Sequence, residues 1–166
     1  MNDTAIAMAM ALLRGFEGFR SHPYLCPAGY WTIGYGDRYL RSGKPVRPNT
    51  PPITEAFASS LMENEVRFFD TALSCLVKVP LSDRQRAALL SWQYNVGTPA
   101  VEGSTLLRKL NSGDYAGAAH ELMRWNKATV NGRLVDLPGL TTRRALERDV
   151  FLGVRPVPME ADHGSV

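Results

Sequence analysis

The sequence predicts an α+β fold that is mainly α, with a small β lobe and a larger helical lobe joined by one long helix. Aromatic and β-branched residues alternate with glycines only over residues 19–40, which favours a small β-hairpin or meander. After residue 54 the apolar residues mostly recur at the three- and four-residue spacing of helices. The chain has 166 residues, 45% hydrophobic and 21% charged, which indicates one globular domain.

The first helix is expected over residues 5–17, before Gly18, which can end it. Its apolar residues recur at helical spacing: Ile6, Ala9, Leu12, Leu13 and Phe16. This apolar run is short for a membrane span and lacks the basic flank of a signal peptide, so we expect no export signal. A proline-rich connector follows the β region at residues 41–53.

The linking helix is expected over about residues 54–77, with Thr54 as its cap. Ser82 and Gln85 form a capping box for the next helix, which should end near Gly97. Further helices are expected at 104–111, 114–125 and 142–152, with a loop from 127 to 140. We therefore expect one catalytic domain over 1–153, with lobes at 1–53 and 78–153 and a flexible tail at 154–166. A groove between two lobes suits an extended polymer.

Three reactive side chains lie within 16 residues: the carboxyl of Glu17, the thiol of Cys26 and the hydroxyl of Thr32. Cleavage of a glycosidic bond needs a proton for the leaving oxygen and a base or nucleophile on the opposite face of the sugar. Glu17 is the candidate acid, because Phe16 and Phe19 would shield it from water and favour its protonated form. The alternative is an ordinary solvated glutamate at a helix end.

Cys26 is the candidate second group, acting either as a base toward water or as a nucleophile on the anomeric carbon. A free thiol titrates near about 8.5, and a cation such as Arg20 could lower that pKa. The alternative is a small buried hydrophobe. Thr32 has the same strand parity as Cys26, so both are expected on one face, where Thr32 could hold the attacking water. It could also be an ordinary strand threonine.

Composition limits the partners. The three histidines share no metal-ligand spacing, so no metal or cofactor is expected. The net charge of +3 favours polyanions only weakly, and we expect no nucleic-acid partner. Two cysteines, Cys26 and Cys75, leave a single bridge open. The basic run of Arg143, Arg144 and Arg148 is either a solvated helix face or a surface that contacts the active site or an anionic envelope.

Four motifs in order resemble those of phage endolysins of the T-even lysozyme type, glycoside hydrolase family 24. They are Glu17-Gly-Phe-Arg with Tyr24 and Gly29-Tyr-Trp-Thr32-Ile-Gly-Tyr-Gly36, then Trp92–Gly97, Ser104–Asn111 and Leu137–Arg144. The resemblance implies a lysozyme-like fold and a muramidase that cuts the β-1,4 bond between N-acetylmuramic acid and N-acetylglucosamine. It implies Glu17 as general acid and Thr32 as the residue that positions water.

The candidate substrate-binding residues are Tyr24, Tyr35, Tyr94, Asn95 and Arg143. The resemblance implies that Tyr94 and Asn95 match positions near the saccharide groove, whereas Tyr35 is an aromatic side chain that could stack on a sugar ring. Tyr35 is equally compatible with the core, and Arg143 matches an arginine that pairs with the acidic catalyst. Cys26 departs from the family, whose best-known members carry aspartate there, although some similar proteins carry cysteine. The missing export signal suggests accumulation in the host cytoplasm, and the resemblance implies release through a holin pore to the periplasm and cell wall. We expect a monomer.

Two other functions remain open at this point. A lytic transglycosylase would use Glu17 alone, with the muramic 6-hydroxyl attacking in place of water. A non-catalytic wall-binding or membrane-disrupting module would act through the basic C-terminal helix.

Overall fold

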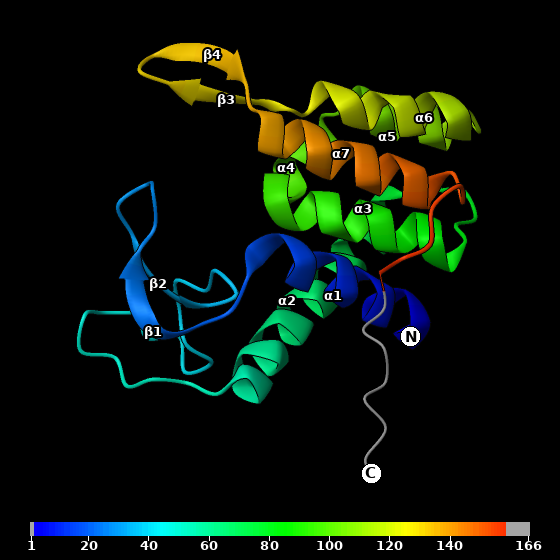
Figure 1. Cartoon of the computed structure of the whole chain (residues 1–166). Helices are drawn as coiled ribbons and strands as arrows, with labels where there is room; N and C mark the ends of the chain where they lie inside the picture. Colours follow the sequence, from blue (N-terminus) through cyan, green and yellow to red (C-terminus); the bar gives the residue numbers. More distant parts are fainter. Residues whose placement is uncertain (1, 159–166) are drawn as a thin grey trace.

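The computed structural model describes residues 2–158 and has two lobes joined by a long helix (Figure 1). Its elements are α1 Asp3–Glu17, β1 Arg20–Leu25, β2 Trp31–Gly34, α2 Glu55–Leu76, α3 Asp83–Val96, α4 Thr98–Glu102, α5 Thr105–Asn111, α6 Tyr115–Glu121, a 3-10 turn η1 Leu122–Arg124, β3 Lys127–Val130, β4 Arg133–Asp136 and α7 Pro138–Phe151. The predicted α+β, mainly α architecture is confirmed.

Local capping signals set the ends of the helices. The Thr54 side chain accepts a hydrogen bond from the Phe57 backbone N–H at 3.1 Å, and α2 begins at the next residue after this cap. Ser82 and Gln85 form the expected capping box before α3. The first helix begins two residues earlier than predicted, because Asn2 caps it through the Ala5 N–H.

The core lies in the helical lobe. Helix α3 is packed between α1 and α7, as Figure 1 shows. Its largest fully buried side chain is that of Trp92, which stacks edge-on against Trp125 with 5.4 Å between ring centroids. Because α1 contributes buried residues along most of its length, its C-terminal residue Glu17 is held in a fixed position at the edge of the β lobe.

The predicted loop over residues 127–140 is wrong: β3 and β4 form an antiparallel hairpin there. Asn131 and Gly132 both have positive φ, 50° and 77°, which is the type I′ geometry that suits a two-residue hairpin. The hairpin side chains are mostly exposed, so no alternation of buried and exposed residues marked the strands. In Figure 1 this hairpin projects from the helical lobe above the β lobe.

The helices near this hairpin also differ from expectation. Helix α7 begins at Pro138, four residues earlier than predicted. Proline is favoured at the first position of a helix as well as in loops, so Pro138 did not distinguish the two. The short α4 was not predicted, and residues 114–125 divide into α6 and η1.

Part of the predicted flexible tail is ordered against the core. Val157 is 9% exposed and belongs to the main hydrophobic cluster. Residues 159–166 of that predicted tail lie outside the described residues. Within residues 2–158, no helix combines the length and apolar character that a membrane crossing needs.

Candidate active site

Glu17 lies at the end of α1 and opens toward the space between the lobes. Its Oε1 accepts a hydrogen bond from Arg143 Nη1 at 2.9 Å, and its side chain is 26% exposed. The turn after β2 approaches from the other side, since a Cβ on Gly36 would lie 3.7 Å from Glu17 Oε2. The ion pair that the family resemblance implies is confirmed, and the carboxyl is fixed in direction while remaining reachable.

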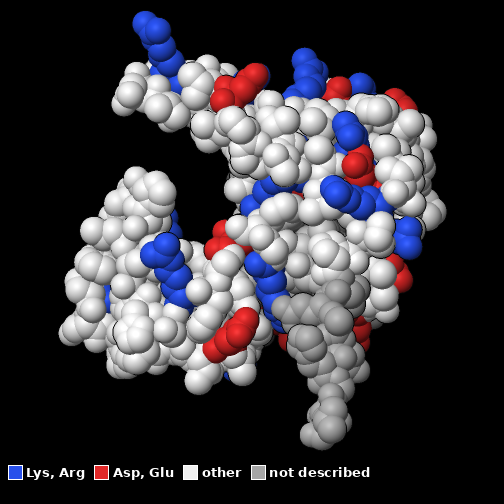
Figure 2. Space-filling view, in the orientation of Figure 1, with Lys and Arg blue, Asp and Glu red and all other residues white. Residues whose placement is uncertain are grey.

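Figure 2 shows a hollow between the β lobe and the helical lobe. A pocket of about 360 Å³ adjoins it, lined by Gly36, Asp37, Arg38, Tyr39 and Glu65. The predicted groove is therefore present, and its inner end carries both acidic and basic side chains (Figure 2).

Cys26 follows β1 and is half-buried, with its sulfur near hydrogen-bond donors. The pKa of its thiol is lowered, chiefly by the Tyr30 backbone N–H, with smaller contributions from the N–H groups of Ala28 and Gly29 and from the Thr32 hydroxyl. Partial burial opposes this shift. The turn thus favours a thiolate, as successive N–H groups favour any anion.

Arg20 does not play the role expected of it. Its guanidinium lies over the ring of Tyr24, 4.4 Å from the centroid. The main cause that lowers the Cys26 pKa is the backbone of the turn.

Thr32 shares a sheet face with Cys26, as its parity predicted. Tyr24 pairs directly with Thr32 across the β1–β2 ladder, and Cys26 lies two residues beyond Tyr24. The Thr32 hydroxyl donates to the Tyr30 carbonyl at 3.0 Å and lies within reach of the thiol. Thr32 itself is only 3% exposed, so its hydroxyl has few directions available.

Tyr24 is half-buried and lies within electrostatic reach of both reactive groups. Burial is the main cause that raises the pKa of its phenol, Arg20 opposes the rise, and the charges of Glu17 and Cys26 add to it. The Tyr24 side chain therefore lies near both Glu17 and Cys26, and its contact with a sugar stays a prediction.

Two of the expected substrate contacts, Tyr35 and Arg143, are largely buried among protein groups. Tyr35 is 2% exposed; its hydroxyl donates to Glu55 at 2.7 Å and its ring packs on Phe19, so it belongs to the core. The three nitrogens of Arg143 donate to Glu17, Glu147 and the Ser91 carbonyl, and a contact of Arg143 with the saccharide stays a prediction.

Tyr94 and Asn95 lie at the end of α3. The Tyr94 hydroxyl bonds to Glu65 and its ring packs edge-on against Phe69; burial is the main cause that raises its pKa. Asn95 is exposed, and its Oδ1 accepts from Arg144. Of the two, only Asn95 keeps a largely exposed side chain.

The basic run on α7 is not a solvated face. Arg143 and Arg144 are 7% and 1% exposed and converge on the fully buried Glu147, at 3.1 and 2.6 Å. Arg148 pairs with Asp149. The two buried guanidiniums therefore bind within the protein, and a contact of this helix with an anionic envelope stays a prediction.

Asp37 and Glu65 were missed in the sequence. Asp37 is 9% exposed, and its Oδ2 has no hydrogen-bond partner among the described residues. Burial, with repulsion from Glu65, raises the pKa of Asp37 to about 6. Burial also raises the pKa of Glu65, despite its bond to Tyr94. No sequence signal joins the two residues, because Asp37 lies in the β lobe and Glu65 on the linking helix α2.

The remaining features do not add to this site. Among residues 2–158 no group of three or more His, Cys, Asp or Glu side chains could hold a metal ion. Both cysteines are free. Ile53 bonds to Ser21 of β1, so the β lobe adjoins the start of α2, whereas Cys75 lies about 30 Å further along that helix. A Cys26–Cys75 bridge does not fit this fold.

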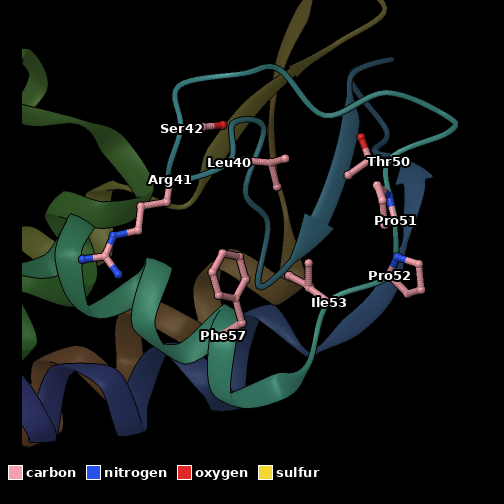
Figure 3. Close-up of a pocket in the computed structure, with 8 residues that line it drawn as sticks. All are labelled: Leu40, Arg41, Ser42, Thr50, Pro51, Pro52, Ile53 and Phe57. Carbon is pink, nitrogen blue, oxygen red and sulfur yellow. The ribbon is translucent and has the colours of Figure 1, made fainter.

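A larger cavity of about 520 Å³ lies apart from these residues, under the proline-rich connector (Figure 3). Leu40, Ile53 and Phe57 give it an apolar lining, and the Arg41 guanidinium points away from it in Figure 3. It includes none of the predicted site residues.

The fold and the site define a two-lobed glycoside hydrolase. The phage lysozyme family model matches residues 14–147, so the chain belongs to the phage lysozyme family. It is 39% identical over 142 residues to an endolysin of Acyrthosiphon pisum secondary endosymbiont phage 1, covering 86% of this chain and 93% of that one.

Solved structures of similar proteins support the same family. The endolysin from Escherichia coli O157:H7 phage FAHEc1 superposes with a TM-score of 0.84 at 34% identity, covering 89% of this chain and 92% of that chain. The muramidase domain of SpmX from Asticaccaulis excentricus gives 0.76 at 33% identity, covering 87% and 94%. The chain is thus a lysozyme, a glycoside hydrolase with muramidase activity.

Proposed function

We propose that this endolysin hydrolyses the β-1,4 bond between N-acetylmuramic acid and N-acetylglucosamine in peptidoglycan, with Glu17 as general acid and Cys26 as general base. The observation that supports it most directly is the surroundings of Cys26, where backbone N–H groups and the Thr32 hydroxyl favour a thiolate beside the groove. Glu17 opens toward the same groove, so an acid and a base face one substrate space.

The reaction follows from these positions. The Glu17 carboxyl gives its proton to the glycosidic oxygen while Arg143 fixes its direction. The Cys26 thiolate takes a proton from a water held by the Thr32 hydroxyl, and the water oxygen forms a new bond to the anomeric carbon as the glycosidic bond breaks. The leaving sugar departs as an alcohol, and water attack from the opposite face inverts the anomeric carbon.

Cys26 attacking carbon directly would instead give a covalent intermediate and retention. The base role is preferred because the Thr32 hydroxyl lies beside the thiol and donates its hydrogen to the Tyr30 carbonyl, so its oxygen can accept a hydrogen bond from a water next to the thiolate. Proton NMR of freshly cleaved product distinguishes the two, because inversion yields the α-anomer first.

The proposal is tested with Glu17→Gln and Cys26→Ala on purified peptidoglycan. Glu17→Gln should abolish cleavage, and Cys26→Ala should lower kcat by at least about 100-fold. Product masses should correspond to addition of one water; an anhydro product, lighter by one water, would establish a transglycosylase instead. Equal rates for Cys26→Ala and the unsubstituted chain would remove Cys26 from the mechanism.

We also propose that the enzyme acts as a monomer, reaching the wall from the host cytoplasm through a holin pore, which the relationship to phage endolysins supports. Expression in a bacterial host with and without a holin tests the release step. Lysis at the same time and rate without the holin would contradict it.

A further inference from the structure

The turn that faces Glu17 is closed by Asp37. Ile33 and Asp37 exchange backbone hydrogen bonds at 3.0 and 2.9 Å, which folds the intervening residues into a tight loop. Gly34 and Gly36 take positive φ of 66° and 103° within it. The turn directly follows the strand that carries Thr32, and Gly36 approaches the Glu17 carboxyl. Movement of this turn therefore changes the position of one wall around the catalytic acid.

The Asp37 side chain points back into the fold. Its unpartnered Oδ2 is buried. A Cβ placed on Gly34 would lie 2.9 Å from that oxygen, 3.1 Å from Ala58 Cβ and 3.2 Å from Ile53 Cδ1. The oxygen thus shares a crowded, largely apolar space where the β lobe meets α2. An uncharged carboxyl fits this space at much lower cost than a carboxylate does.

The charges around Asp37 also oppose its ionisation. Glu65 on α2 and Glu17 on α1 both repel a carboxylate there, and only the N–H groups of Tyr35 and Asp37 itself favour one. The other titratable groups that face it are two phenols: Tyr24 on β1 and Tyr94 on α3. Arg38 is adjacent in the chain, but its guanidinium stacks on Tyr30 at 3.5 Å.

We propose that Asp37 is a positioning residue for glycosidic cleavage: its uncharged carboxyl holds the Ile33–Asp37 turn in place against Glu17, and ionisation loosens the turn and slows the reaction. The pKa of Asp37 is about 6, so the turn should loosen as the pH rises through about 6. The proposed reaction needs a thiolate at Cys26 and a proton on Glu17, which together give the rate an optimum in pH. Ionisation of Asp37 adds to the fall in rate on the alkaline side of that optimum.

Two substitutions should move that optimum in opposite directions. Asp37→Asn keeps the size of the side chain and cannot ionise, so the pH of maximal kcat should rise by at least about half a unit. Glu65→Gln removes one repelling charge and can still accept from Tyr94, so Asp37 ionises at lower pH and the optimum should fall. The exposed Glu102→Gln should leave the optimum unchanged.

The measurement is kcat and KM on solubilised peptidoglycan from pH 4.5 to 9, with carbon NMR following the Asp37 carboxyl. The shifts should lie in kcat, with KM changed less than about twofold. An unmoved optimum in Asp37→Asn, or shifts in the same direction for both variants, overturns the proposal. If Asp37→Asn does not fold, Glu65→Gln and the NMR titration still decide: an Asp37 that titrates near 4 would end it.

Discussion

Replacing Asp37 with asparagine should stabilise the protein, and the gain should depend on pH. The pKa of Asp37 is about 6 in the folded chain against 3.8 for a free side chain. This increase in pKa corresponds to about 3 kcal/mol. The folded state holds this proton more tightly than the unfolded state does. The free-energy cost of ionising Asp37 in the folded chain is therefore absent below pH 4, grows between pH 4 and 6, and is complete above pH 6.

The assay is urea denaturation of the parent chain and Asp37→Asn at pH 4, 5, 6, 7 and 8, comparing their free energies of unfolding at each pH. The variant should be equal to or slightly less stable than the parent at pH 4, and up to about 3 kcal/mol more stable at pH 7 and above. Glu102→Gln, an exposed carboxyl, should show a constant small difference. A difference for Asp37→Asn that does not grow with pH would refute the assigned burial.

Three further predictions concern residues of the groove. Cys26→Ser should lose most activity, because a hydroxyl is far less acidic than a thiol, whereas Cys26→Asp should stay active and extend activity to lower pH. Rates of cell-wall cleavage measured across pH test both, and an active Cys26→Ser or an inactive Cys26→Asp would contradict them. Arg143→Met should destabilise folding by about 3–5 kcal/mol, since it leaves the buried Glu147 with less compensation, and a loss below 1 kcal/mol in denaturation would contradict this. Gly34→Ala should cost more than Gly29→Ala: both have positive φ, but only the first Cβ meets neighbours, at 2.9 Å, so equal melting temperatures would exclude the steric contact.

The hydrogen-bond and packing signals that act over a few residues were readable in the sequence. The Thr54 cap and the Ser82–Gln85 capping box fixed the starts of α2 and α3 because their donors lie three residues away. The hairpin around Asn131 was not predicted, because the side chains of its strands are exposed. Its two-residue turn was visible in the sequence, but nothing marked its strands as buried on one face.

The sequence by itself determined the two-lobed class, the family and the local cluster of Glu17, Cys26 and Thr32, because strand parity and helix spacing are properties of neighbouring residues. Tertiary structure alone decided what surrounds that cluster. Arg143 approaches Glu17 from 126 residues away, and Asp37 encounters Glu65 on another element. Charge and burial depend on such distant partners, so they appear only when the chain has folded.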